Sequence, residues 1–283
     1  MRDAGMRDGA EAPPGPEAQA LLAGLLVDPS TTAVVTDFDG TLASIVEDPS
    51  SARPLAGVPG LLHQLAQAFG VVAVVSGRPA SFLAEHLRVP SDATLPTDRL
   101  HLIGLYGLES IGPDGSVVLD EAAVAWLPVV AEAAGRIGMA APDGVLVEVK
   151  GAAVTVHWRS FPEAEGWVLD QVAEESSNTG LTVHLARRSV ELRPPLSIDK
   201  GTVLRRLTDG CTAACILGDD VGDVPAFVEL ARRGAEGLST VAVAVIDEET
   251  APEVVASADL SVTSPHGAVA ILAWLAAQST PNR

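Results

Sequence analysis

The sequence predicts an α/β fold, in which a doubly wound parallel sheet forms the core and a smaller α/β domain is inserted into it. Two observations predict the parallel sheet: short segments of continuously apolar residues read as buried strands, and segments with helical spacing separate them. A third observation predicts the insertion, because segments in the middle of the chain alternate between apolar and polar residues. Such alternation is typical of antiparallel strands that are covered on one face only.

These patterns divide the chain into three parts. We expect residues 30–108 and 194–283 to form the core and residues 109–193 to form the inserted cap domain. Residues 1–29, which begin with a stretch rich in Gly, Pro and Ala, are expected to be a flexible tail followed by a short helix near Leu21. A length of 283 residues, 47% of them hydrophobic, is sufficient for two domains.

Composition excludes several classes of partner. The net charge of −19 argues against binding to nucleic acid or to an anionic membrane, because Lys and Arg supply that affinity. Cys211 and Cys215 are the only cysteines, too few for a disulfide scaffold or a four-cysteine zinc site, and we expect them to be core residues. The sequence starts without a basic segment followed by an apolar run, and "AVAILAWLAA" is too short to span a bilayer. We therefore expect a cytoplasmic protein.

The core elements follow one another in order. Strands are predicted in "AVVTDFDG", "VVAVVSG", "LHLIGLYG", "AACILGDD", "TVAVAVI" and "DLSV", and helices in "GVPGLLHQLAQAF", "RPASFLAEHL" and "SPHGAVAILAWLAAQ". In the last of these, Ser264 is the expected N-cap and Pro265 the first helical residue. Ligands of such sheets bind at the carboxyl ends of the strands. The residues predicted at these ends are Asp37, Ser76, Asp219 and Asp220.

The alternating segments are "VLVEVKG", "AAVTVHWRS" and "LTVHLARRSVELRP", with a helix from about Pro162 between the last two. Their spacing predicts one apolar face and one polar face. On the apolar face we expect Val145, Val147, Val149, Val154, Val156, Trp158, Val190 and Leu192; on the polar face we expect Glu148, Lys150, Thr155, His157, Arg159, Glu191 and Arg193. The polar face either meets water, as most such faces do, or contacts a substrate.

Two carboxylates, Asp37 and Asp39, end the first strand of the core and share one face because they are two residues apart. A magnesium ion would relieve their repulsion, since its preferred ligands are hard oxygen atoms. A carboxylate is also a nucleophile towards phosphorus. The alternative is that the pair only forms a turn and caps a helix.

Three further stretches carry groups suited to a phosphate and a metal ion. "VVSGRP" places the hydroxyl of Ser76 after a strand, and "IDKGTVL" places the cation of Lys200 at the start of a helix. "ILGDDVGDVPAF" supplies Asp219, Asp220 and Asp223. Taken alone, each stretch could be structural, as a surface lysine or a solvated acidic turn.

Together, the patterns D-x-D-G-T, S-G-R, K-G and G-D-D-x-x-D resemble those of the haloacid-dehalogenase-type phosphatases. The stretches "DFDGTLASIVEDPSSARP", "YGLE", "VEVKGAAVTVHWR", "ELRPPLSIDKG" and "GDDVGDVPAF" are similar to trehalose-6-phosphate phosphatases. The resemblance covers most of the chain from Thr31 to Phe227 and the core beyond. It implies magnesium-dependent hydrolysis of trehalose 6-phosphate to trehalose and phosphate, through an aspartyl-phosphate, in trehalose biosynthesis.

The resemblance also implies roles for core residues. Asp37 would attack the phosphate, and Asp39 would protonate the leaving sugar oxygen and then deprotonate the hydrolytic water. Ser76 and Lys200 would bind the transferring phosphate, with Arg78 nearby. The magnesium residues would be Asp37, Asp39 through its backbone carbonyl, Asp219 and Asp220, with Asp223 supporting the metal shell and Lys200.

In the cap, the resemblance implies that Glu148, Lys150 and Glu191 bind sugar hydroxyls, together with His157 and Arg159. The chain departs from the family at two places. Tyr106 replaces the usual histidine before the Gly of "YGLE", and the residues from Gly222 to Pro225 replace a T-D-E-D run. The first departure leaves the sugar preference open.

Three interpretations of function remain open at this point. The chain could hydrolyse trehalose 6-phosphate, or another sugar phosphate such as sucrose 6-phosphate or glucosylglycerate phosphate. It could instead be a non-catalytic partner that regulates a trehalose-phosphate synthase. The carboxylates of Asp37 and Asp39 argue against the last interpretation, because a binding module needs no general acid. A synthase remains a possible partner.

Overall fold

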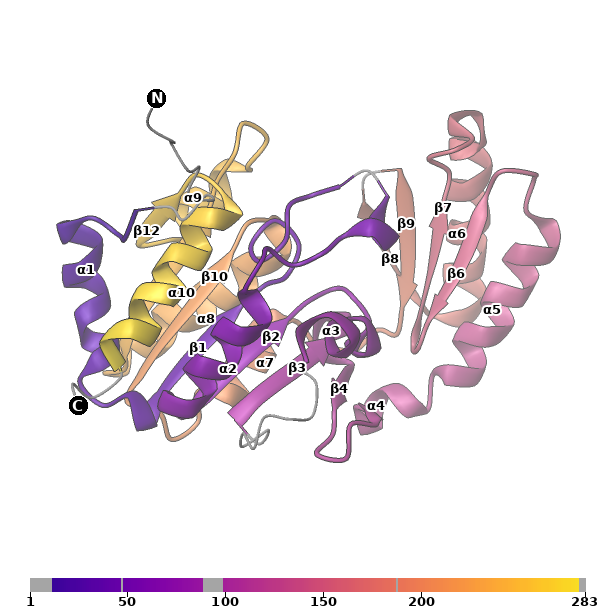
Figure 1. Cartoon of the computed structure of the whole chain (residues 1–283). Helices are drawn as coiled ribbons and strands as arrows, with labels where there is room; N and C mark the ends of the chain where they lie inside the picture. Colours follow the sequence, from indigo (N-terminus) through magenta and orange to yellow (C-terminus); the bar gives the residue numbers. More distant parts are fainter. Residues whose placement is uncertain (1–11, 47, 89–98, 187, 280–283) are drawn as a thin grey trace, which may run out of the picture.

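The computed structural model describes residues 12–46, 48–88, 99–186 and 188–279, which form two β-sheets with helices packed on them (Figure 1). The first eleven residues of the predicted tail lie outside the described residues. Helix α1 (Pro16–Leu22) lies where a short helix is predicted near Leu21. Within the described part of the chain, every helix is too short or too polar to cross a membrane.

The larger sheet has the strand order β12-β11-β10-β1-β2-β3-β4-β5. Neighbouring strands from β12 to β3 are parallel, and β4 and β5 are antiparallel additions at one edge. The predicted doubly wound α/β core is therefore confirmed. Its strands are β1 (Thr32–Thr36), β2 (Val71–Val75), β3 (Leu100–Gly104), β4 (Glu109–Ile111), β5 (Val117–Leu119), β10 (Ala213–Gly218), β11 (Ser239–Val245) and β12 (Leu260–Val262).

The two antiparallel strands lie inside the range predicted for the cap. Glu109 pairs with Gly104, and β4 then pairs with β5, so the larger sheet continues to Leu119. A boundary between residues 108 and 109 would therefore cut through this sheet. Both strands have only three residues, which is too short for an alternating pattern to reveal them. The division into domains itself stays a prediction.

Helices cover both faces of the larger sheet because successive residues of a buried strand point to opposite sides. In β1, Val34 packs in one apolar cluster with residues of α2, α3 and α10, whereas Ala33 and Val35 pack in another with residues of α7, α8 and α9. The helices of the two layers are α2 (Val58–Ala68), α3 (Ala80–Leu87), α7 (Lys200–Leu207), α8 (Val224–Ala235), α9 (Pro252–Ala256) and α10 (Pro265–Ser279). As predicted, Ser264 caps α10, where its hydroxyl accepts from the N–H of Gly267.

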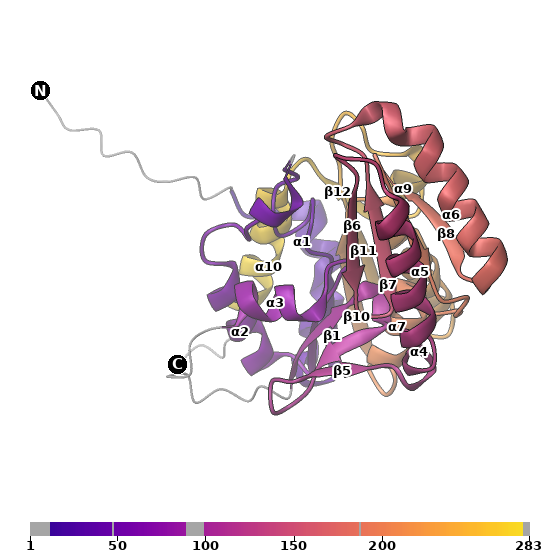
Figure 2. The same cartoon turned by 90° about the vertical axis from the view of Figure 1, so that its right-hand side faces the viewer.

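The second sheet has four antiparallel strands in the order β6-β7-β9-β8. Figures 1 and 2 show α5 and α6 packed along one side of it, away from the larger sheet. Its elements are β6 (Leu146–Lys150), β7 (Ala153–His157), β8 (Thr182–Ala186), β9 (Ser189–Arg193), α5 (Leu127–Ala140) and α6 (Glu165–Thr179), and the short helix α4 (Glu121–Val124) precedes them. That this sheet acts as a cap stays a prediction.

The apolar face of the second sheet is buried only at its centre. Val154, Val156, Val190 and Leu192, on the inner strands β7 and β9, are fully buried under α5 and α6. Val149 of the edge strand β6 was predicted on the same face but is 55% exposed, whereas Val147 of the same strand is partly buried against this cluster. Alternation therefore predicted the face correctly and did not predict the depth of burial.

This difference in burial predicts unequal effects of two matched substitutions. Val156→Ala should lower the free energy of unfolding by roughly 1.5–3 kcal/mol, the contribution of burying one valine side chain. Val149→Ala should change it by less than about 0.5 kcal/mol, as is usual at an exposed site. Urea unfolding of both variants measures the difference. An equal loss of unfolding free energy in both variants would mean that α5 and α6 do not bury Val156.

Candidate active site

The predicted site residues meet where β1, β2 and β10 end side by side. Asp37 follows β1, Ser76 follows β2 and Asp219 follows β10, and the three strands are in parallel register. The chain order along the sheet reverses between β10 and β1. At such a point the connections leave to opposite faces, which opens a crevice at the carboxyl ends of the strands.

Lys200 lies among carboxylates at the bottom of this site. Its side chain is only 3% exposed, and its Nζ lies 2.8 Å from Asp37 Oδ1 and 2.5 Å from Asp223 Oδ1. Asp199 and Thr202 form a capping box that fixes the first turn of α7, where Lys200 is the first residue. Burial alone would lower the pKa of Lys200, but Asp223 and Asp37 raise it well above its usual value. The ammonium group therefore stays charged although it is buried.

Three carboxylates converge beside Lys200 and could hold a metal ion. One oxygen each of Asp37, Asp219 and Asp223 lies within 4.8 Å of the others. The pKa of Asp37 is raised to about 8 and the pKa of Asp219 to about 9; burial is the main cause, the neighbouring carboxylates add to it, and Lys200 opposes it. Crowded, buried carboxylates of this kind fit a hard divalent cation such as magnesium, which would compensate their charge.

Asp220 and Asp223 occupy different places from those that the sequence suggests. Asp220 caps the short turn that follows β10, where its Oδ1 accepts from the N–H of Gly222 at 2.7 Å. Asp223 is fully buried and accepts from the N–H groups of Asp219 and Asp220 as well as from Lys200. The structure thus groups Asp223, and not Asp220, with Asp37 and Asp219.

Gly40 allows this convergence. Its φ is +71°, and a Cβ atom at this position would lie 1.9 Å from Asp219 Oδ2. Any other residue would be strained in its backbone and would collide with the Asp219 carboxylate. The glycine of D-x-D-G is therefore required both for the turn after β1 and for the approach of β10.

Asp39 forms an ion pair with Arg78, which lies in the loop after β2. The Arg78 Nε and Nη2 atoms each donate to one Asp39 oxygen at 2.7 Å, which makes a two-pronged ion pair. Burial alone would lower the pKa of Arg78, but the hydrogen bond and charge of Asp39 raise it. In this arrangement both oxygens of Asp39 are occupied as acceptors. Ser76 lies beside this pair and is buried, and its hydroxyl accepts from the N–H of Arg78 at 3.2 Å.

The predicted residues of the second sheet form two groups on its polar face. Glu148 lies 3.3 Å from Lys150 Nζ and 3.0 Å from His157 Nε2, and the hydrogen bond with His157 is the main cause that lowers the pKa of Glu148. Glu191 accepts from Nε and Nη2 of Arg193 at 2.9 and 3.2 Å. Arg159 belongs to neither group.

Tyr106 and Arg193 connect the two sheets, and neither was predicted as a site residue. The Arg193 guanidinium lies 3.9 Å from the centre of the Tyr106 ring, and the backbone N–H of Tyr106 donates to the carbonyl of Ser76. The ring packs so closely on Gly77 that a Cβ there would lie 2.6 Å from the Tyr106 hydroxyl oxygen. Tyr106 has a φ of +59°, an uncommon value for a non-glycine residue. The sequence feature that could have identified Tyr106 as a site residue is its position in "YGLE", where the chain departs from the family.

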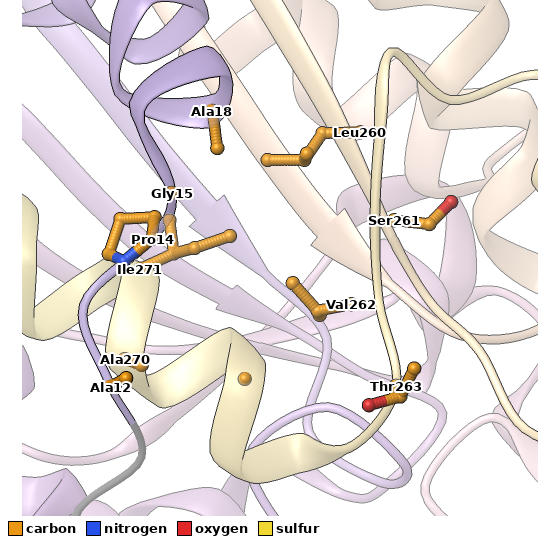
Figure 3. Close-up of a pocket in the computed structure, with 11 residues that line it drawn as sticks. Ala12, Pro14, Gly15, Ala18, Leu260, Ser261, Val262, Thr263, Ala270 and Ile271 are labelled. Carbon is orange, nitrogen blue, oxygen red and sulfur yellow. The ribbon is translucent and has the colours of Figure 1, made fainter.

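A cleft continues from the carboxylates along the ends of β10 and β11. It is lined by Asp219 and Asp220 from the larger sheet and by Arg159 and Arg188 from the segments of the second sheet. Arg159 therefore lines the cleft, and its role in binding the substrate stays a prediction. A separate hollow lies between α1, β12 and α10 (Figure 3), and its lining carries no titratable side chain among the described residues.

Comparisons with known proteins relate this chain to one family. The model of the trehalose-phosphatase family matches residues 35–264. A trehalose-phosphate phosphatase of Mycobacterium avium (strain 104) is 38% identical over 205 residues, which cover 69% of this chain and 50% of the relative. The chain thus spans about half the length of the curated relatives it matches.

Two solved structures share the fold. The C-terminal domain of C. albicans trehalose-6-phosphate phosphatase superposes with a TM-score of 0.69 at 21% identity, covering 94% of this chain and 98% of that domain. The C-terminal domain of the Candida albicans trehalose synthase regulatory protein superposes with a TM-score of 0.61 at 17% identity, covering 90% of this chain and 97% of that domain. At these identities the likeness shows the fold alone.

The burial of Lys200 predicts a large effect on stability. Lys200→Met keeps the length of the side chain but leaves buried carboxylates without their cation, which should cost roughly 3–5 kcal/mol of unfolding free energy. Lys150→Met removes a cation from the partly exposed pair with Glu148 and should cost about 1 kcal/mol or less. Urea unfolding at neutral pH without divalent ions compares the two variants. A small, equal loss in both would contradict the compensating role of Lys200.

Proposed function

Because the chain belongs to the trehalose-phosphatase family, we propose that it hydrolyses trehalose 6-phosphate to trehalose and inorganic phosphate. The observation that carries this proposal is the buried contact between Asp37, which follows β1, and Lys200, the first residue of α7. A carboxylate that can attack phosphorus there has beside it a fixed positive charge that attracts a phosphate group.

In the proposed reaction, an Asp37 oxygen attacks the phosphorus atom and forms an aspartyl-phosphate. The bond between phosphorus and the sugar oxygen breaks, and its electron pair stays on that oxygen, which takes a proton from Asp39. Water then attacks the phosphorus atom of the aspartyl-phosphate and loses a proton to Asp39, which frees Asp37 and inorganic phosphate. Lys200 and Ser76 hold the phosphate oxygens during both steps.

The ion pair between Asp39 and Arg78 adds a condition to this mechanism. Asp39 cannot donate a proton while both of its oxygens accept from Arg78. A bound phosphate, with its own charge, would draw the Arg78 guanidinium away, because guanidinium also binds phosphate with two parallel hydrogen bonds. Substrate binding would thereby release Asp39 for its acid role.

The carboxylates of Asp37, Asp219 and Asp223 would hold the magnesium ion in this proposal. The backbone carbonyl of Asp39 is expected to join them, and Asp220 is retained as a predicted contributor. When bound, magnesium neutralises charge on the carboxylates and on the phosphate, so that one anion is able to approach another.

The polar face of the second sheet would bind the sugar part of the substrate. Glu148, Lys150, His157 and Glu191 present donors and acceptors there, and a sugar hydroxyl requires both. Arg159 would reach the substrate from the cleft lined by Asp219 and Asp220. These assignments explain why a disaccharide, rather than a small phosphoester, would be preferred.

The fold alone does not separate an enzyme from a regulatory partner, since the C-terminal domain of the Candida albicans trehalose synthase regulatory protein shares it. The arrangement of Asp37, Lys200 and the Asp39–Arg78 pair supports the enzyme. A domain that only binds another protein would gain nothing from three crowded carboxylates, two of them buried, because burying charge costs stability.

A panel of sugar phosphates tests the proposed function. Wild-type protein with magnesium should release phosphate from trehalose 6-phosphate faster than from sucrose 6-phosphate or glucosylglycerate phosphate. Asp37→Asn sets the background, because its amide cannot form the aspartyl-phosphate. Preference for another sugar phosphate would correct the substrate. Release that is no faster than in Asp37→Asn would refute the enzyme.

Magnesium binding is predicted to be measurable without activity. Adding magnesium to chelator-treated protein should raise its Tm, because an ion that binds the folded state stabilises it by mass action. Asp219→Asn should lose most of that increase, whereas Asp114→Asn, on the exposed turn between β4 and β5, should keep it. An equal Tm with and without magnesium in the wild type would count against a metal site at these carboxylates.

A further inference from the structure

Four side chains form one row across the polar face of the second sheet. Glu148 on β6 pairs with Thr155 on β7, Thr155 pairs with Glu191 on β9, and Glu191 pairs with His184 on β8. Directly opposite residues of antiparallel strands have their side chains on the same face. With neighbouring strands about 4.8 Å apart, the row is roughly 14 Å long. That length exceeds the width of one sugar ring.

Thr155 differs from the other three members of the row. It is only 4% exposed, and among the described residues its hydroxyl has no hydrogen-bond partner. The charged or polar ends of its neighbours all have partners: Glu148 binds His157 and Lys150, Glu191 binds Arg193, and His184 lies 3.0 Å from the Thr182 hydroxyl. A buried hydroxyl without a partner costs stability and is uncommon, so its presence requires an explanation.

The row faces the candidate active site. Helices α5 and α6 cover the opposite face of the sheet, on the side away from the larger sheet (Figure 1). Arg193, the partner of Glu191, stacks on Tyr106, whose backbone N–H donates to Ser76. At the other end of the row, the charge of Glu148 contributes to raising the pKa of Arg78. Thr155 thus lies between two side chains that interact with the phosphate end of the site.

We propose that the Thr155 hydroxyl is a further substrate-binding group, which hydrogen-bonds one sugar hydroxyl between Glu148 and Glu191. The proposal rests on the proposed function. A threonine side chain on a strand is stiff at χ1, so its hydroxyl has a fixed position. The longer side chains beside it are able to adjust to several sugars, whereas Thr155 would select a sugar by the position of one hydroxyl.

Although Thr155 is buried, the side chains next to it on the polar face could move aside for a ligand. Its nearest neighbours on the same face, by register, are Glu148 and Glu191. Both are long side chains that can change rotamer, and the side chain of Glu148 is already 45% exposed. A ligand that pairs with the two carboxylates would therefore reach the hydroxyl without a change in the backbone.

Two matched substitutions test the proposal. Thr155→Val removes the hydroxyl and keeps the shape, and Thr155→Ser keeps the hydroxyl. Efficiency, kcat/KM, is measured on the sugar phosphate that the wild type hydrolyses best in the panel, and on p-nitrophenyl phosphate, which has no sugar. Thr155→Val should lose about three- to tenfold on the sugar phosphate, mainly through KM, and less than about twofold on p-nitrophenyl phosphate. Thr155→Ser should stay within about twofold of the wild type on both.

Thermal unfolding of the free proteins separates substrate binding from a structural role. If the hydroxyl has no partner without substrate, Thr155→Val should have a Tm equal to or above that of the wild type. A lower Tm, or equal losses on both substrates, would overturn the proposal. Because the best sugar phosphate is chosen by the panel, preference for one other than trehalose 6-phosphate refutes the proposed substrate and leaves the test of Thr155 intact. Hydrolysis of no sugar phosphate by the wild type would refute both.

Discussion

The candidate site depends on the compensation of buried charge around Lys200. Asp37 and Asp223 each contact its ammonium group, and Asp219 adds a third carboxylate within reach of a common metal ion. Burial raises the pKa of Asp37 even though Lys200 lowers it, so the charge on this carboxylate depends on the cations beside it. In the proposed function, the same crowding that costs stability would create a site for a cation and for a phosphate group. Stability and function are therefore in conflict here, and Lys200 limits the conflict.

Much of the surrounding structure holds these groups at short range. The capping box of Asp199 and Thr202 fixes the start of α7, and therefore the position of Lys200. Gly40 lets Asp219 approach the turn after β1, and Asp223 binds the two N–H groups that follow β10. None of these three features carries out chemistry. Each one removes a steric or hydrogen-bonding obstacle to the approach of charged side chains.

Arg193 and Tyr106 link the second sheet to this site. Arg193 stacks on Tyr106, and Tyr106 in turn binds the loop that carries Ser76 and Arg78. The chain leaves β9 at Arg193 and reaches Lys200 only seven residues later. A shift of β9 would therefore move both the face proposed to bind the sugar and the lysine proposed to bind the phosphate. This arrangement offers a physical route by which occupation of the polar face could affect the chemistry.

The sequence by itself determined the parallel core, the positions of its strand ends and the alternating strands of the second sheet, since these follow from local periodicity. It also singled out Asp37, Asp39, Ser76, Lys200 and the acidic run from Asp219, because each follows a recognisable strand or begins a helix. Only the tertiary structure decided that Asp223 lies close to Asp37 and Asp219 while Asp220 caps a turn, because carboxylates three residues apart differ in direction through backbone geometry that periodicity does not encode. The same holds for Tyr106 against Arg193, for the added strands β4 and β5, and for the unpartnered hydroxyl of Thr155. Each of these depends on contacts between segments far apart in the chain, and residue types at local spacing do not specify them.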